Sequence, residues 1–392
     1  MKNDTQNTSL WNDLKSLPRP YWVLFTGTLI NRFGHFVMPF LALYLQREGY
    51  PAWVTAVALG AYGAGGLIAG LLGGYCADRW GRKLTIIISC SGGAVCMMLL
   101  SQALNPWSIV IVSSAVGMFS AMYFPAASAL LADLVPEPLR VRAFGCQRLA
   151  VNLGFAVGMA TAGLMAEHSF FMLFVVDALT TSALGIVILF GVPEVRKTTQ
   201  VNASWAPAIR EMRKNPNYLR AVAASFFIAM VFWQLSSTWG LQITTRGGFN
   251  ESIYGALMAL NGIMIVLLEL PLTSWTRKHL PVRVMTIGYS LVGVGMGVNL
   301  FGFSLPVLIV VMVVVTIGEM LSLPVAHSYI AGLAPEEMRG RFMGVLGIAW
   351  NAATMLGPVL GMALFAVWPD GVWLACLAMG LAAGWVVRPH SE

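Results

Sequence analysis

Charged residues are scarce in this chain. Asp, Glu, Lys and Arg make up 10% of its 392 residues, whereas soluble domains average about 25%. Apolar residues make up 57%, more than a folded domain in water could hide from solvent. A lipid bilayer removes this difficulty, because the outward faces of the helices must then be apolar as well. The composition therefore predicts a polytopic membrane protein.

The chain also lacks the patterns of several function classes. Its five cysteines contain no Cys-x-x-Cys pair, so they indicate neither a disulfide framework nor a zinc site. No P-loop motif is present, which argues against direct use of ATP. No Ser, His and Asp arrangement and no metal-ligand spacing stands out, so we expect neither enzyme activity nor a cofactor. The net charge of +7 does not indicate nucleic acid, because the basic residues lie between apolar runs.

Twelve apolar runs are long enough to span a bilayer, which takes roughly twenty residues each. The first six lie at about 21–46, 52–77, 84–103, 106–133, 144–166 and 169–191. The second six lie at about 218–241, 251–276, 282–304, 306–333, 340–366 and 371–388. We therefore expect a tail at 1–20, a six-helix bundle at 21–191, a central loop at 192–217 and a second bundle at 218–392.

The basic residues favour one orientation. With the N-terminus inside, most loop cations fall on the cytoplasmic side: Arg79, Arg82, Lys83, Arg140, Arg142, Arg196, Lys197, Arg210, Arg213, Lys214, Arg277, Lys278, Arg283, Arg339 and Arg341. Only Arg47 and Arg246 remain for the outer loops, as the positive-inside rule requires. The polar start, 1–19, has no signal-peptide pattern. We expect both termini on the cytoplasmic side of the membrane.

An internal repeat relates the two groups of spans. A shift of 199 residues places Pro125 on Pro324, Arg140 on Arg339 and Asn152 on Asn351. Over 125–158 the ungapped match contains twelve identities. Two six-helix halves with the same orientation predict a parallel repeat about an axis along the membrane normal.

A charged, glycine-containing loop joins the second and third spans. It reads Gly74-Tyr-Cys-Ala-Asp78-Arg79-Trp-Gly81-Arg82-Lys83. This segment resembles the signature loop of the major facilitator superfamily, G-x-x-x-D-R-x-G-R-K/R, and the span count and repeat extend the resemblance over essentially the whole chain. The resemblance implies an all-α membrane protein with two six-helix bundles related by a pseudo-two-fold axis.

In that family the loop helps to latch the two bundles together on the cytoplasmic side. The resemblance implies such a conformational role, not substrate binding, for Gly74, Asp78, Arg79, Gly81, Arg82, Lys83, Asp133, Arg142 and Glu269. The second copy of the loop is degraded, with Leu270, Ser274 and Trp275 where Gly, Asp and Arg are expected.

The resemblance is strongest to the bacterial drug:proton antiporter branch, with two departures. The glycine run of the fifth span, Gly154 to Gly163, carries Met159 where that branch often has proline. Ser113 stands where those exporters often carry an arginine on the fourth span. Glycines at intervals of four also let helices pack closely, whatever is transported.

Ionisable residues inside predicted spans usually have a partner and a task. On the first span Arg32 shares a face with His35 and follows Asn31. On the tenth span Glu319 precedes His327, which could line the same cavity nearer the cytoplasm. Since the first and tenth spans line the cavity in the family, we hypothesise that Glu319 binds the coupling proton and that Arg32 is its counter-charge or an anchor for an anionic group. A purely structural ion pair is the alternative.

Three further ionisable residues receive structural interpretations. Asp177 lies on the sixth span, which is peripheral in the family, so we expect it to pack with a buried hydrogen bond. Arg148 lies near the inner end of the fifth span, and its long side chain could simply reach the interface. Glu269 is close to the degraded loop, which favours the latch-like role.

Polar, aromatic and thioether side chains complete a candidate substrate site. The candidates are Trp233, Gln234, Met118, Met122, Tyr123, Trp350 and Asn351, since soft side chains suit varied apolar ligands. We predict a monomeric secondary transporter in membrane lipid that exports small amphipathic compounds in exchange for protons by alternating access. Proton-coupled transport of a specific polar or anionic solute, such as a peptide, sugar or metallophore, is the alternative. A non-transporting receptor on the same fold is a third possibility.

Overall fold

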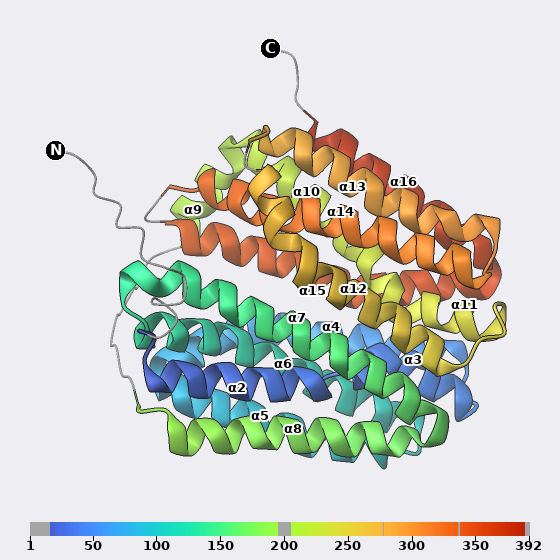
Figure 1. The fold of residues 1–392 in the computed structure, drawn as a ribbon, viewed down its shortest axis with the longest axis horizontal. Helices are drawn as coiled ribbons and strands as arrows, with labels where there is room; N and C mark the ends of the chain where they lie inside the picture. The colour runs from blue at the N-terminus through green and yellow to red at the C-terminus, as the bar shows by residue number, and fades with distance from the viewer. Residues whose placement is uncertain (1–15, 195–204, 277, 336–337, 389–392) are drawn as a thin grey trace.

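The computed structural model describes residues 16–194, 205–276, 278–335 and 338–388, and these residues form helices and connecting turns with no strand among them (Figure 1). The first half contains α2 (Arg19–Gly34), α3 (Val37–Arg47), α4 (Ala52–Trp80), α5 (Arg82–Ser101), α6 (Pro106–Leu134), α7 (Arg140–His168) and α8 (Phe170–Gly191). The second half contains α10 (Pro216–Gln234), the π-helical segment η2 (Leu235–Trp239), α11 (Gly240–Thr245), α12 (Glu251–Thr276), α13 (Pro281–Gly297), η3 (Val298–Phe301), α14 (Leu305–Gly332), α15 (Arg339–Val367) and α16 (Pro369–Val387).

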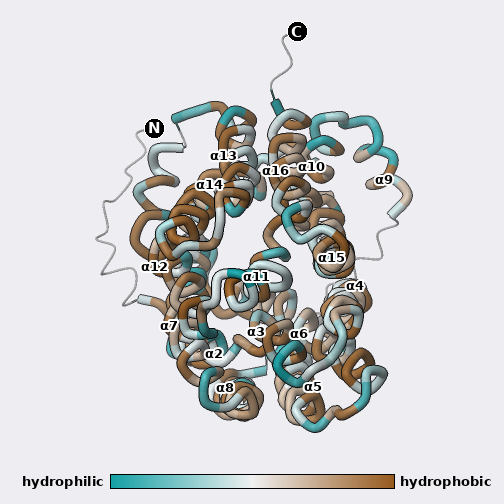
Figure 2. The backbone as a smooth tube through the Cα atoms, turned by 90° about the vertical axis from the view of Figure 1, so that its right-hand side faces the viewer, coloured by the Kyte–Doolittle hydropathy of each residue, from teal (hydrophilic) through white to brown (hydrophobic). Residues whose placement is uncertain are grey.

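The repeat predicted from the sequence is visible in the helix bounds. Shifting α7 by 199 residues gives the bounds of α15, and the same shift takes the start of α4 to that of α12 and the start of α6 to that of α14. Seen end-on, the two sets of helices form two halves around a common centre (Figure 2). The predicted fold class, twelve spans in two bundles, is therefore confirmed.

The first span departs from the predicted continuous helix over 21–46. Eleven helices of the described residues are long and apolar enough to cross a bilayer, and the missing pass is split into α2 and α3. The chain bends at Gly34, His35 and Phe36, where the Phe36 N–H bonds the Gly34 carbonyl at 2.9 Å. The repeat places this break opposite η2 in the second half, so both halves depart from regular α-helix at the same depth.

Two seams join the halves, α4 against α15 and α7 against α12. Glycines bring the backbones into contact at equivalent places in both. A Cβ added to Gly63 would lie 2.3 Å from the Met355 nitrogen, and one added to Gly262 would lie 2.7 Å from the Ala156 Cβ. Without a hydrophobic driving force between helices in lipid, such close packing is what holds the halves together.

The two ends of the helix bundle differ. The end that carries Arg82, Arg140 and Arg339, together with the start of α2 and the end of α16, is called the basic end below (left in Figure 1). At the opposite end, called the far end, α3 and α11 lie across the centre between the halves (Figure 2). Here the halves are joined by an ion pair between Arg47 and Glu251 at 3.6 Å, and the Tyr254 hydroxyl donates to the Pro39 carbonyl at 3.2 Å.

The outer surface of the bundle is apolar. Large side chains such as Leu104, Phe190, Phe301 and Val367 are more than 80% exposed, which a surface in water would not tolerate in such number. The predicted polar loop at 192–217 contains a helix that the sequence analysis did not anticipate, α9 (Trp205–Lys214). Apart from α9, the outward-facing side chains fit a lipid environment.

Gly81 joins α4 to α5 with a backbone that other residues rarely adopt. Its φ of 94° and ψ of 151° fall in a region that is essentially restricted to glycine, and an added Cβ would lie 2.3 Å from Glu194 Oε1. Backbone strain of this kind costs about 1–3 kcal/mol. We expect Gly81→Ala to lower the free energy of unfolding by more than that, because the new Cβ also clashes with Glu194. Gly302→Ala is the matched control, since Gly302 has φ 116° and ψ −172° but open space around it. The measurement is thermal unfolding in detergent, followed with a thiol-reactive dye. Equal melting temperatures of the two variants would contradict the prediction.

Candidate functional site

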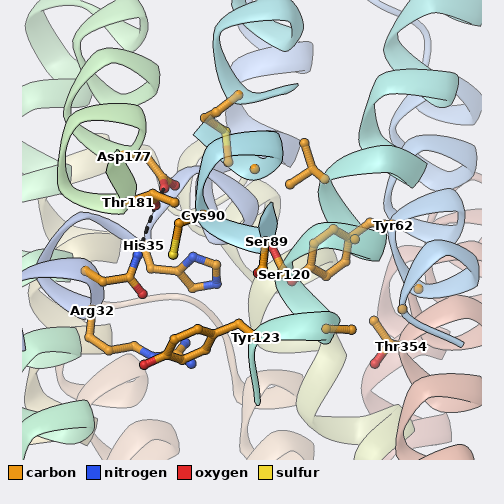
Figure 3. A pocket seen from close by; sticks show the side chains of 18 of the residues that line it. Arg32, His35, Tyr62, Ser89, Cys90, Ser120, Tyr123, Asp177, Thr181 and Thr354 are labelled. Carbon is orange, nitrogen blue, oxygen red and sulfur yellow. Dashed lines mark hydrogen bonds between the residues drawn. The ribbon is translucent and has the colours of Figure 1, made fainter. Parts of the chain in front are cut away.

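A central cavity of about 220 Å³ lies mainly within the first half (Figure 3). Its lining is rich in polar and aromatic side chains, and these are Asn31, Arg32, His35, Tyr62, Ser89, Ser120, Tyr123, Asp177, Thr181, Trp233, Asn351 and Thr354. The second half contributes only Trp233 from α10 and Asn351 and Thr354 from α15 among these. Such convergence of polar groups in a cavity is typical of small-molecule sites.

Helix α8 lines this cavity, although the family resemblance implied a peripheral place for the sixth span. The reason is the break in the first span. Gly34 has no side chain, and a Cβ there would lie 1.9 Å from the Thr180 Oγ1, so α8 packs directly against the break. Asp177, one turn away, therefore reaches the cavity.

Asp177 is 2% exposed and is tied to the broken span. Its carboxylate accepts a hydrogen bond from the Thr181 hydroxyl at 3.3 Å and lies near the backbone N–H of Val37, the first residue of α3. A carboxylate is favourable there, because the first N–H groups of a helix have no partner within the helix. Asn31 extends the contact from α2 by donating to the Thr181 hydroxyl at 2.9 Å. The packing role expected for Asp177 therefore accounts for only one of its carboxylate oxygens. The other oxygen, Oδ2, is buried without a hydrogen-bond partner.

Arg32 and His35 line the central cavity together, as their spacing predicts. Arg32 also lines a second cavity nearer the basic end, as does Tyr123, so these two side chains stand at the junction. The Arg32 Nε atom is buried without a hydrogen-bond partner, and among the described residues no acid pairs with Arg32 within 4.0 Å. Asp177 is within electrostatic range of Arg32 but forms no direct ion pair with it.

The second cavity, of about 430 Å³, is predominantly apolar. Its apolar wall comes from α6, α7 and α14 and consists of Phe124, Ala127, Leu131, Phe144, Val151 and Leu323. Arg148 and His327 are the ionisable residues that line it besides Arg32 and Tyr123. His327 thus lines the cavity nearer the basic end, but it does not share that cavity with Glu319 as its spacing suggested.

Glu319 lies in a different environment from the one that its predicted pairing with Arg32 requires. Its carboxylate accepts a hydrogen bond from the Asn261 amide at 2.8 Å, and Glu319 is not among the residues that line either cavity. The repeat places Asn261 and Glu319 at the positions that Tyr62 and Ser120 hold in the first half. Glu319 is thus the second half's counterpart of a residue in the cavity wall.

An ion pair between Arg148 and Glu269, at 2.5 Å, crosses the α7–α12 seam toward the basic end. Arg148 therefore has a partner, in addition to the interfacial exposure expected from its long side chain. Both groups lie within electrostatic range of Glu319. The equivalent positions on the α4–α15 seam are Gly347 and Gly70, so this ion pair has no symmetric copy.

The other predicted substrate residues fall into two groups. Tyr123, Trp233 and Asn351 line the central cavity. The rest pack away from it: the Gln234 amide donates to the Gly357 carbonyl at 2.8 Å, Trp350 stacks on Phe232, and Met118 and Met122 pack with Ala69 and Cys76. Besides Asp177, the sequence analysis missed Tyr62, Ser89, Ser120, Thr181 and Thr354.

The predicted latch residues are only partly placed. Arg82 forms an ion pair with Asp133, but both residues belong to the first half, on α5 and α6. This ion pair therefore does not itself join the two halves. Gly74 and Asp78 lie in α4, and their side chains fall outside the described residues. The latch role of Arg79, Gly81, Lys83 and Arg142 stays a prediction.

Comparison with known proteins agrees with this architecture. A sequence profile described as Major Facilitator Superfamily matches residues 24–247 and 238–392. A Na⁺, Li⁺, K⁺/H⁺ antiporter of Planococcus maritimus is 26% identical, with 82% of this chain and 84% of that protein covered. The quinolone resistance protein NorA of Staphylococcus aureus is 24% identical, with coverage of 88% and 89%. The fold is similar to that of a solved variant of the nucleoside transporter NupG, with a TM-score of 0.81 at 14% identity over 94% of this chain and 98% of that one.

Proposed function

Because this chain belongs to the major facilitator superfamily, whose members are transporters, we propose that it exports small amphipathic compounds in exchange for protons. The basic end faces the cytoplasm of a bacterium in this proposal, since short basic loops stay on that side of the inner membrane. The protein then works as a single chain, by alternating access between the two halves.

The observation that carries the proposal is the junction of two cavities at Arg32 and Tyr123. The apolar cavity lies toward the basic end, and the polar central cavity lies beyond it. At the far end the halves are joined by α3, α11 and the Arg47–Glu251 ion pair. This arrangement suits a substrate that enters from the cytoplasmic side with an apolar part and a polar part.

Proton coupling is supported by the charges on the α7–α12 seam. One cation from the first half, Arg148, faces two carboxylates from the second half, Glu269 and Glu319. One guanidinium can neutralise only one carboxylate, and a second unpaired charge inside the membrane is costly. Proton binding at Glu319 removes that charge. Its release would draw Arg148 away from Glu269 and change the contact between the halves.

The relatives support antiport as well. One bears the name of a cation/proton antiporter and another that of a quinolone resistance protein. The alternative, proton-coupled transport of a specific polar or anionic solute, is favoured by one observation. The central cavity contains a cation, Arg32, which repels simple cationic drugs.

The test is transport in proteoliposomes with an imposed pH gradient. We expect a fluorescent amphipathic dye to accumulate against its gradient when the lumen is acidic, and to leak back when an ionophore dissipates the pH gradient. Protein-free liposomes are the control. Movement that ignores the pH gradient would contradict proton antiport, and movement of a labelled sugar in place of the dye would favour the alternative.

A further inference from the structure

We propose that the substrate is a small zwitterion with an apolar body, bound with its cationic group at Asp177 and its anionic group at Arg32. This inference rests on the proposed transport function and specifies the substrate class. It concerns the central cavity and its junction with the apolar cavity, where both residues meet open space (Figure 3).

Two residues that can carry opposite charges line the central cavity within electrostatic range of each other, but they form no direct ion pair. Oδ2 of Asp177 and Nε of Arg32 are both buried and both lack a hydrogen-bond partner. The structure records no ion pair between these two described residues, although both face the same cavity. An unpaired charge inside a membrane protein costs free energy. A ligand that pairs with both residues at once therefore gains more binding free energy than a ligand that pairs with one of them.

The rest of the lining adds no third fixed charge. The other titratable residues that face the cavity are His35 beside Arg32, Tyr62 on α4, Cys90 on α5 and Tyr123 on α6. A ligand with only a cationic group would leave Arg32 unpaired and close to it. A ligand with only an anionic group would do the same with Asp177. A zwitterion satisfies both residues and carries no net charge into the membrane.

The two cavities give the ligand an orientation. Asp177 lines the central cavity but not the apolar one. Arg32 stands at the junction with the apolar cavity. The ammonium group therefore lies deepest, the carboxylate sits at the junction, and the apolar body extends into the second cavity among Phe124 and Leu131.

The test compares three ligands that share one body: the dipeptide Leu-Phe, its C-terminal amide and its N-acetyl form. Binding to the purified protein in detergent is followed by intrinsic tryptophan fluorescence, which needs neither a pH gradient nor transport. We expect the zwitterion to bind about tenfold or more tightly than either analogue, as the loss of one charged hydrogen bond predicts.

Two variants assign the two ends of the ligand. Arg32→Gln should weaken binding of the zwitterion and should not weaken binding of the amide, so that the difference between these two ligands disappears. Asp177→Asn should bring it down to the affinity of the N-acetyl form. Arg32→Lys keeps the positive charge and should retain part of the preference for the zwitterion over the amide. Gly145→Ala, at a helical position with open space, is the neutral control.

Equal or tighter binding of the amide, equal effects of both variants on all three ligands, or binding of none of them would overturn the proposal. Because Asp177 also holds the start of α3, its variant is compared with wild type by thermal unfolding. If it does not fold, the ligand series and the Arg32 variants decide. If the ligand ranking holds but proton-driven transport is absent, the proposed antiport fails and the zwitterion site stands.

Discussion

Glu319→Gln will reduce proton-driven accumulation of substrate to the level of protein-free liposomes, while substrate binding stays within a factor of about two. The amide keeps the hydrogen-bonding shape and the contact with Asn261, but it cannot exchange a proton. Arg148 would then stay with Glu269 throughout the cycle, because no second carboxylate competes for it. The variant therefore separates binding from coupling.

The measurement is uptake into proteoliposomes with and without a pH gradient, together with exchange at equal substrate concentrations. Exchange without a gradient should persist in Glu319→Gln, since it needs no net proton movement. Glu48→Gln, an exposed glutamate at the end of α3, is the matched control and should behave as wild type. If Glu319→Gln still transports substrate against its gradient at the wild-type level, Glu319 is not the coupling site. Asp177 would then be the next carboxylate to change.

Linking the halves at the far end will stop transport completely and reversibly. Arg47 and Glu251 come from different halves, and their side chains approach to 3.6 Å. If both are replaced by cysteine and joined by a short, cleavable thiol cross-linker, α3 can no longer separate from the start of α12. Alternating access requires that separation, so transport should fall to background and return after cleavage.

Each single cysteine variant treated with the same reagent is the control for modification of native thiols. Four of the five native cysteines are buried and Cys146 is half-buried, so little background reaction is expected. A cross-linked protein that still transports at the wild-type rate would show that the far end does not open during the cycle.

Helix number and the relation between the halves could be predicted from the sequence because they depend on features that repeat. Span length follows from bilayer thickness, and Pro125 with Pro324 fixes the register of the repeat. The break in the first span could not be predicted. Pro39, in the first turn of α3, has no N–H to bond the His35 carbonyl. However, Pro125, Pro271, Pro324 and Pro358 all lie inside helices that continue through them, so a proline by itself does not predict a break. Neighbouring helices can satisfy the backbone groups that a proline frees in a membrane.

The sequence predicted which residues of the candidate site lie together on one helix, but not which residues of different helices meet. Helical spacing placed Arg32 and His35 on one face, and both line the central cavity. Partners on other helices depend on how each helix is rotated and packed, which spacing does not give. Arg148 with Glu269 is such a case, as is Asp177 with the start of α3. Glu319 was singled out correctly as a buried acid, but its neighbour is Asn261 and not Arg32.

The unequal seams also bear on the ancestry and the motion of the molecule. A precursor built from two identical halves would carry the Arg148–Glu269 ion pair twice or not at all, so the asymmetry of the two seams arose after the halves diverged. The opposite seam has Gly70 and Gly347 at the same depth and no charge to separate there. At that depth, widening of the basic end therefore separates an ion pair between α7 and α12 but two glycines between α4 and α15. We therefore expect the two bundles to separate unequally at the two seams, although the bundles themselves are nearly equivalent.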